Sequence, residues 1–313
     1  MKKSVLLIIM AIVLFLTGSS FAQQDIYDCS SYKNAGDYYR AIEAGKRAIR
    51  LYPKNGYAHF CLGDAYYLTG ESNLAIKSMK EAEKLSYSER ELMLIYNRLG
   101  MIYRALSDYD NALIYNNRYL SLAHKLENRT EEATALNNIA LIHNAKGEPD
   151  KALSYYEEAL RLMADEKAKS PTYNNIALIY SNEGDYNKAI SYFKKALEIS
   201  ERYGNYHGAA IVMLNLGDTY RSAKDFIKAE EYFTEGLKRI LRVGDKRSEA
   251  NAYKYIGAMY RDKGEVQKAK DYLTKAYNLF EIIGAKDGAK DAITMLNEIK
   301  LSEKKHKQEK TNE

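Results

Sequence analysis

Apolar residues recur three or four positions apart along most of the chain, in segments separated by short polar turns. One pair of segments carries the pattern through Leu136, Ile139 and Ala140 and, after a turn, through Ala152 and Tyr156. This spacing places the apolar side chains on one face of an α-helix. The pattern therefore predicts pairs of amphipathic helices and an all-α fold, with each helix burying its apolar face against its partner.

A repeated motif marks these helix pairs. It consists of Leu or Ile, a small residue, an aromatic residue or His three positions later, and an Ala twelve positions after the small residue. The motif begins at Leu62, Leu99, Ile139, Ile176, Leu216 and Ile256. A degenerate first copy contains Cys29, Tyr32 and Ala41. The distance between copies varies while the distance inside each copy is constant, which indicates a tight helical hairpin followed by a segment of variable length.

The predicted turn inside most copies contains Gly followed by an acidic residue. The glycines are Gly36, Gly70, Gly147, Gly184 and Gly264. Glycine adopts the left-handed conformation that ends a helix, and an acidic residue favours the start of the next one. Ser107 and Lys224 stand at the turn position in two other copies. We expect those two hairpins to pack less regularly.

The motif resembles that of the tetratricopeptide repeat (TPR) family, which combines Leu-Gly or Leu-Ala with Tyr, a turn Gly and two Ala at these offsets. The fifth copy carries it through Ile176, Ala177, Tyr180, Gly184, Tyr186, Ala189, Phe193 and Ala196. Copies of 40 residues with Asn-Asn-Ile-Ala look like the kinesin light-chain type. The usual Trp is absent, and Tyr119 and Gly236 replace the second Ala. Sel1 repeats are the closest alternative, with a longer hairpin turn.

The resemblance implies a right-handed α-solenoid of about seven TPR helix hairpins plus a C-terminal capping helix. We place the repeats near residues 23–55, 56–89, 93–130, 133–168, 170–206, 210–247 and 250–286. The last hairpin would expose apolar surface, so a polar helix is expected to cover it. Residues 287–305 fit that capping helix, and residues 306–313 form a polar tail.

The N-terminus is typical of a secretory signal peptide covering residues 1–22. Lys2 and Lys3 precede an apolar run from Val5 to Leu16, and Ser20 and Ala22 provide small residues for cleavage. A membrane anchor is the alternative, but a span needs about 20 apolar residues. We expect cleavage, no stable membrane span in the mature chain, and a periplasmic or secreted location. The short dibasic leader suits a bacterial source.

Charge and cysteine content narrow the class of protein further. The formal net charge is only +5, with 47 basic and 42 acidic residues, which argues against a nucleic-acid partner. The chain contains 2 Cys, Cys29 and Cys61, on consecutive predicted first helices. An exported chain permits a disulfide between them. Because Cys29 occupies the small-residue position of its own hairpin, we expect two free, buried thiols.

The sequence contains no pattern that indicates catalysis. No two of the 5 His share metal-ligand spacing, and there is no Gly-rich phosphate loop or Gly-x-Ser-x-Gly turn. His143 replaces the repeat Tyr and is expected to be a packed residue. We therefore predict a non-enzymatic protein that needs no cofactor or metal.

The candidate binding residues lie on the first helix of each hairpin, which lines the concave groove in TPR proteins. The predicted groove residues are Asn97, Arg98, Arg104, Asn137, Asn138, Asn174, Asn175, Asn215, Arg221, Lys254 and Arg261. An Asn amide both donates and accepts, so it matches the backbone of an extended peptide. The kinesin light-chain resemblance implies this role for Asn138, Asn175 and Asn215.

Two features of this set leave alternatives open. The asparagines are either ligand-binding groups or bridges between adjacent repeats. Basic residues outnumber acidic ones at the groove positions, since Lys33 adds to the set above and the acids are Asp64, Asp218 and Asp262. This surplus favours a mildly acidic ligand or a free carboxylate, which Arg can bind through two hydrogen bonds.

Three functions are compatible with these observations. The first is an exported interaction module that binds an extended peptide or protein segment in its concave groove. The second is a structural or assembly scaffold that acts through self-association. The third is a sensory TPR component of a bacterial signalling system. We favour the first, because the Asn and Arg residues recur at the same face of successive repeats.

Overall fold

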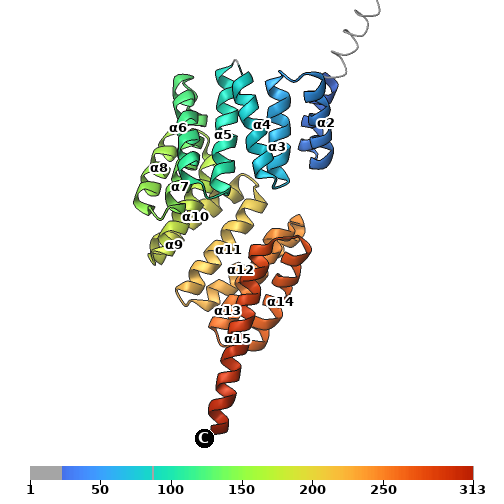
Figure 1. Cartoon of the computed structure of the whole chain (residues 1–313). Coiled ribbons are helices and arrows are strands. Elements are labelled where there is room, and N and C mark those ends of the chain that lie inside the picture. Colours follow the sequence, from blue (N-terminus) through green and yellow to red (C-terminus); the bar gives the residue numbers. More distant parts are fainter. Residues whose placement is uncertain (1–22, 87, 313) are drawn as a thin grey trace, which may run out of the picture. The chain divides into compact units, whose positions relative to one another are not determined.

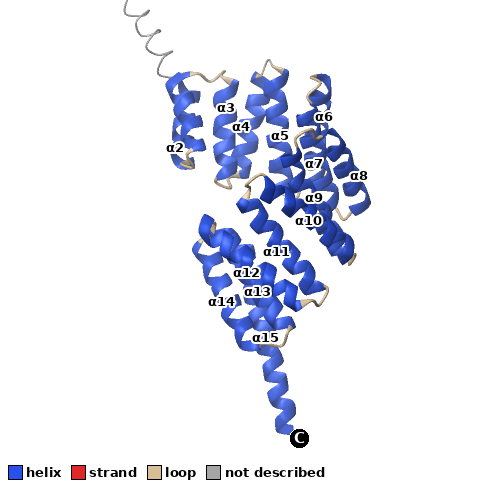
Figure 2. Ribbon diagram, turned by 180° about the vertical axis from the view of Figure 1, so that it is seen from behind, coloured by secondary structure: helices blue, strands red, loops and turns tan. Residues whose placement is uncertain are grey.

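The structure, a computed structural model, describes residues 23–86 and 88–312, with side chains as far as residue 304. Every regular element in these ranges is a helix, and they contain no strand (Figure 2). The predicted all-α fold is confirmed. The predicted signal peptide, residues 1–22, lies outside the described residues. The chain divides into two compact units, Met1–Leu162 and Met163–Glu313.

The first unit contains four helix pairs, each joined by a tight turn. The first pair consists of a helix over residues 23–34 and α2 (Tyr38–Leu51). The other pairs follow in chain order (Figure 1): α3 (Gly56–Leu68) with α4 (Ser72–Leu85), α5 (Glu89–Ala105) with α6 (Tyr109–Lys125), and α7 (Arg129–Ala145) with α8 (Pro149–Leu162).

The second unit contains three further pairs and a final helix, after a short 3₁₀ helix at Glu166–Ala168. Its elements are α9 (Lys169–Asn182) with α10 (Tyr186–Arg202), α11 (Tyr206–Ser222) with α12 (Phe226–Val243), α13 (Lys246–Asp262) with α14 (Val266–Ile282), and α15 (Lys286–Asn312). The described residues thus form seven hairpins and one more helix, as the fold class predicts. The backbone of α15 is helical through Asn312, so this helix is longer than the expected 287–305.

Side-chain caps and left-handed turns set where the helices begin and end. Asp185 accepts a hydrogen bond from the backbone N–H of Lys188, and Asp or Asn side chains cap α2, α3, α6, α7, α11, α12 and α13 in the same way. Gly184 has φ of 80° at the preceding turn. Ser107 and Lys224 adopt the same conformation without being glycine, with φ of 59° and 63°. These two turns therefore keep the hairpin geometry at a steric cost.

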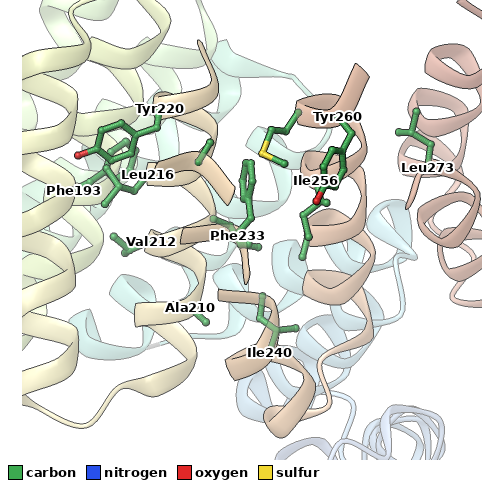
Figure 3. Close-up of a cluster of buried hydrophobic side chains, with 14 of the residues drawn as sticks. Phe193, Ala210, Val212, Leu216, Tyr220, Phe233, Ile240, Ile256, Tyr260 and Leu273 are labelled. Carbon is green, nitrogen blue, oxygen red and sulfur yellow. The ribbon is translucent and has the colours of Figure 1, made fainter. Parts of the chain in front are cut away.

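In five of the seven hairpins, a small residue on the first helix packs against a large apolar or aromatic residue on the second. In the second unit, Phe233 of α12 lies between Leu216 on α11 and Ile256 on α13 (Figure 3). Gly217 makes this approach possible, because a Cβ there would lie 2.8 Å from the Phe233 ring. Four of the repeat tyrosines, at positions 103, 180, 220 and 260, stack on a tyrosine of the second helix of the same hairpin. The ring centroids of Tyr220 and Tyr232 are 5.5 Å apart.

Asn116 is a polar residue at an apolar core position of the third hairpin. Residues four positions after the repeat Ala are otherwise mostly large and apolar or aromatic: Met79, Tyr156, Phe193, Phe233 and Leu273. Asn116 is 1% exposed, and its Nδ2 donates to the carbonyl of Ala112 at 2.8 Å. Its Oδ1 is buried without a hydrogen-bond partner. The third hairpin therefore carries an unsatisfied polar atom in its core.

A disulfide joins the first two hairpins. Cys29 and Cys61 are bonded, with their Cα atoms 6.4 Å apart, and both are buried. The expectation of two free thiols is therefore wrong. Cys29 does occupy the small-residue position of its hairpin, as predicted, but its Sγ also reaches the adjacent first helix, α3. Spacing along the sequence could not show that these two helices approach closely enough for a bond.

Candidate functional site

All eleven predicted groove residues lie on first helices of hairpins, and they divide between the two units. Asn97, Arg98 and Arg104 are on α5, and Asn137 and Asn138 are on α7. The other six are on α9, α11 and α13: Asn174, Asn175, Asn215, Arg221, Lys254 and Arg261. First helices of consecutive hairpins contact each other within each unit. We call these polar side chains the first-helix face of each unit.

In the first unit, a buried carboxylate holds two of the cations. Asp64 on α3 is 2% exposed. Its Oδ2 lies 2.8 Å from Lys33 Nζ, and its Oδ1 lies 2.7 Å from Arg98 Nε. The Arg98 guanidinium also lies over the Tyr67 ring, 5.4 Å from its centroid. Arg98 on α5 therefore links the third hairpin to the second, which carries Asp64. Removing Arg98 would leave the buried Asp64 carboxylate with one cationic partner fewer, which is destabilising.

Two asparagine pairs bridge consecutive hairpins with the same geometry. Asn138 Nδ2 donates to Asn97 Oδ1 at 3.0 Å in the first unit. Asn215 Nδ2 donates to Asn174 Oδ1 at 2.9 Å in the second. The partners are separated by 41 residues in both pairs. The bridging role that the sequence left open is thus present, and each pair uses only part of the hydrogen-bonding capacity of its amides.

The remaining two asparagines make local contacts. Asn137 Nδ2 donates to the carbonyl of Ala133 one turn earlier, at 3.1 Å. Asn175 Oδ1 lies 3.5 Å from Asn174 Nδ2, at the long limit of a hydrogen bond. Both residues are half-buried. Asn175 is therefore held less firmly than the bridging asparagines.

In the second unit, a chain of ion pairs runs from α11 through α13 to α15. Arg221 Nε donates to Asp218 at 2.7 Å, and a second nitrogen of Arg221 donates to Asp262. Asp262 also accepts from Arg261, which reaches Glu298 on α15 at 3.3 Å. Burial opposes ionisation of Arg221, but the charges and hydrogen bonds of Asp218 and Asp262 outweigh it and raise the pKa of Arg221.

Lys254 and Arg261 also line cavities beside α15. Lys254 Nζ lies 3.2 Å from Asp291, in a cavity of about 440 Å³ that includes Arg247 and Asn251. Arg261 and Glu298 line a second cavity of about 820 Å³. The carboxylates of α15 were absent from the sequence count of groove charges. Nothing in the repeat motif marks them, since α15 lies beyond the last hairpin.

The ion pairs reduce the positive charge that a ligand would meet on the first-helix faces. Of the six basic residues counted from the sequence, five have an acidic partner. The exception is Arg104, which is half-buried and forms no ion pair with the side chains that the structure describes. Any preference for an acidic ligand in the first unit would therefore rest on Arg104.

The ionisable side chains of His143 and Tyr119, outside the first-helix faces' predicted set, make contacts that stabilise the fold. His143 Nδ1 lies 2.6 Å from Glu148, and its ring stacks on Tyr155 with centroids 5.3 Å apart. The hydrogen bond from His143 lowers the pKa of Glu148. Burial raises the pKa of Tyr119, whose hydroxyl donates to Glu131. Across the described part of the chain, no group of three His, Cys, Asp or Glu residues is arranged for a metal ion, and no helix has the length and apolarity of a membrane span.

Comparisons with known proteins agree with this architecture. Models of the tetratricopeptide repeat match residues 30–89, 91–165 and 170–242. The photosystem I assembly protein Ycf3 of Prochlorococcus marinus is 30% identical over 120 residues, which cover 38% of this chain and 61% of the relative. The chain therefore spans about three-fifths of that relative's length.

Two solved structures are similar in fold at lower identity. Aspartyl phosphate phosphatase F from Bacillus subtilis has a TM-score of 0.70 and 18% identity, over 88% of this chain and 74% of the other. A Rap protein complexed with Competence and Sporulation Factor has a TM-score of 0.60 and 17% identity, over 91% and 98%. The repeated hairpins and the family matches, which span most of the sequence, show that the chain belongs to the tetratricopeptide repeat family.

Proposed function

We propose that this chain is a non-enzymatic protein-interaction module that binds an extended polypeptide along its first-helix faces. The observation that carries the proposal is the repeated asparagine pair. Each pair fixes two amides side by side on consecutive first helices and leaves donors and acceptors over. An extended peptide presents the complementary N–H and C=O groups in alternation, so successive repeats can contact successive residues of it.

The hydrogen bonds between the paired asparagines hold their amides in fixed orientations before a ligand binds. A half-buried asparagine that is already hydrogen-bonded loses less side-chain freedom when a ligand arrives. Each further hydrogen bond contributes about 0.5–1.5 kcal/mol net. Several such bonds suit the micromolar affinity of a transient interaction, which corresponds to roughly −8 kcal/mol. The Rap structure complexed with Competence and Sporulation Factor is in keeping with a ligand-binding role for this fold.

The experiment compares variants that change the amides with variants that leave the first-helix faces intact. Asn138→Ala and Asn175→Ala are combined as the test variant. Asn117→Ala and Asn187→Ala, combined, are the control, because both residues are exposed on second helices. Partners are captured from an extracytoplasmic extract, and overlapping synthetic peptides from the captured protein are titrated by fluorescence anisotropy.

We expect the test variant to bind the peptide at least tenfold more weakly and the control to bind like the natural protein. Thermal unfolding of each variant shows whether the array stays folded. Equal binding by the natural protein and a folded test variant would exclude the asparagines as the ligand contacts.

We also propose that the mature protein is exported to a periplasmic or extracellular space. The basic and apolar leader supports this location, and the buried Cys29–Cys61 bond suits an oxidising compartment. Fractionation followed by N-terminal sequencing tests the proposal, with Gln23 expected as the first residue. Recovery of the intact leader on a cytosolic protein would contradict it.

A scaffold role is the second candidate, and the similarity to a photosystem I assembly protein favours it. Light scattering over a range of protein concentrations distinguishes a self-associating scaffold from a peptide-binding module. A mass that rises with concentration supports self-association, and a constant monomer mass excludes it.

A further inference from the structure

A cavity of about 390 Å³ lies on the second-helix side of the sixth and seventh hairpins, away from the asparagine pairs. Residues of α12, α13 and α14 line it. Its floor is apolar and buried, and consists of Phe233 on α12 with Ile256 and Met259 on α13. Figure 3 shows Phe233 and Ile256 facing each other across the two helices. The volume falls within the range of cavities that hold small organic ligands.

One stripe of α12 forms the side of this cavity. The stripe runs from Glu230 through Leu237 to Leu241, with residues three or four positions apart. Twelve residues of helix extend about 18 Å. The cavity is therefore elongated along α12, with Glu230 at one end and Arg242 at the other.

α12 packs closely on α11, its partner in the sixth hairpin, on the side away from the cavity. Gly236 stands where most repeats have Ala, and a Cβ there would lie 3.1 Å from Leu214 and 3.3 Å from the Ala210 carbonyl. α12 thus sits so near to α11 that an alanine at this position would be crowded. Its contact with α13 is less extensive than that of α10 with α11 or of α14 with α15.

Leu241 distinguishes α12 from the second helices on either side. The corresponding residues 40 positions away are Glu201 and Glu281, which suit a solvated helix face. Leu241 is apolar and 49% exposed at the rim of the cavity. An exposed leucine at a position that is acidic in neighbouring repeats extends the apolar floor to the surface.

The two ends of the cavity differ in charge. At the first end, Glu230 accepts hydrogen bonds from Tyr260 at 2.7 Å and from Lys263 at 3.1 Å, so its negative charge is compensated. At the other end, Lys238 lies 3.7 Å from Glu235. Arg242 forms no ion pair within the described side chains. The C-terminal end of α12 therefore presents a guanidinium without an ion pair beside an apolar floor, with Glu235 as the acidic residue whose charge it influences.

We propose that this cavity binds an amphiphilic organic anion, with its apolar body over Phe233, Ile256 and Met259 and its carboxylate or phosphate at Arg242. The floor supplies the hydrophobic contribution, and the guanidinium supplies a planar pair of donors for an anionic group. This site shares α13 with the proposed polypeptide site but uses none of the first-helix-face residues, and it does not depend on that site.

The test uses defined probes and isothermal titration calorimetry on the full mature chain. Dodecanoate and dodecyl phosphate carry the expected anion, and dodecyltrimethylammonium carries the same tail with the opposite charge. We expect one molecule of either anion per chain and at least tenfold weaker binding of the cation. No binding of either anion at submillimolar concentration, or equal binding of all three probes, would overturn the proposal.

Three variants locate the bound probe. Arg242→Gln removes the charge, and we expect about tenfold weaker binding of dodecanoate, equivalent to about 1.4 kcal/mol. Leu241→Glu places at the rim the residue that both neighbouring repeats carry, so the array should fold while dodecanoate binding is lost. Arg202→Gln is the matched control, since Arg202 occupies the same register on α10. Unchanged binding by Leu241→Glu, or an equal loss in Arg202→Gln, would place the probe elsewhere and refute the assignment.

Discussion

Reduction of the Cys29–Cys61 bond should loosen the N-terminal end of the array while leaving the rest intact. The bond closes a loop with a sequence separation of 32. The loop-entropy relation gives about 3.7 kcal/mol for a closure of this length at 25 °C. In an array of repeats, each hairpin is stabilised mainly by its neighbours, so the loss should concentrate in the first two hairpins.

Hydrogen exchange measured by mass spectrometry can resolve this local effect. The oxidised and reduced proteins are compared peptide by peptide at neutral pH. For amides in the helix over residues 23–34 and in α2, 3.7 kcal/mol corresponds to roughly several hundredfold faster opening. Amides in α7 and α8, two hairpins further along, serve as the internal control and should exchange at the same rate in both forms.

Three results would refute the reasoning. Alkylation of the unreduced, unfolded protein at both cysteines would show that the bond does not form. Equal exchange of the N-terminal helices in both forms would show that packing alone holds the first hairpin. A uniform increase across the first unit would instead mean that its hairpins unfold together, contrary to the local behaviour expected here.

Three further predictions concern stability. Asn116→Leu should stabilise the protein by about 1–2 kcal/mol in urea unfolding, because it removes an unsatisfied buried oxygen; equal or lower stability would contradict this. Lys224→Gly should add about 0.5–1 kcal/mol by relieving a left-handed residue, whereas a lower Tm would show that the turn is unstrained. The hydrogen bond from Tyr260 lowers the pKa of Glu230, so Glu230 contributes stability above its ordinary pKa that is lost as pH falls through the lowered value. The Tm difference between the natural protein and Tyr260→Phe should therefore shrink from pH 7 to pH 3; a constant difference would exclude this linkage.

The sequence predicted the fold well because the information is local and repeated. Helix periodicity, the turn glycines and the small residue opposite a large one each act within a single hairpin. Gly217 opposite Phe233 illustrates this, since both positions follow from the motif alone. The left-handed conformation at Lys224 likewise follows from its alignment with the turn glycines.

Features that depend on contacts between hairpins were harder to predict. Asp64 pairs with Lys33 and Arg98, which are 31 and 34 residues away in opposite directions. A count of charges at groove positions treats these residues as independent and so overestimates the free positive charge. The disulfide was missed for the same reason, because burial of Cys29 in its own hairpin does not reveal its distance from Cys61.

The candidate sites show the same division. The asparagines could be selected from the sequence because they recur, but whether they bridge hairpins required the structure. Two residues beside the cavity, Gly236 and Leu241, depart from the repeat pattern and can be recognised in the sequence. Neither departure predicts a cavity unless the position of α13 is known. Leu241 stands out as an exception only when the repeats are aligned, because the equivalent residues, Glu201 and Glu281, are acidic.

The asparagine pairs also limit how this array can change by gene duplication and loss. Each pair needs one amide from a hairpin and the other from the next, with α5 followed by α7 and α9 followed by α11. α7 and α9 carry asparagine at both pairing positions, as Asn137 with Asn138 and Asn174 with Asn175, so a copy of either hairpin would bring two amides together again. α5 and α11 carry only one each, so a copy of either would leave a half-buried amide opposite Arg98 or Leu214, and surviving duplications should involve the fourth or fifth hairpin.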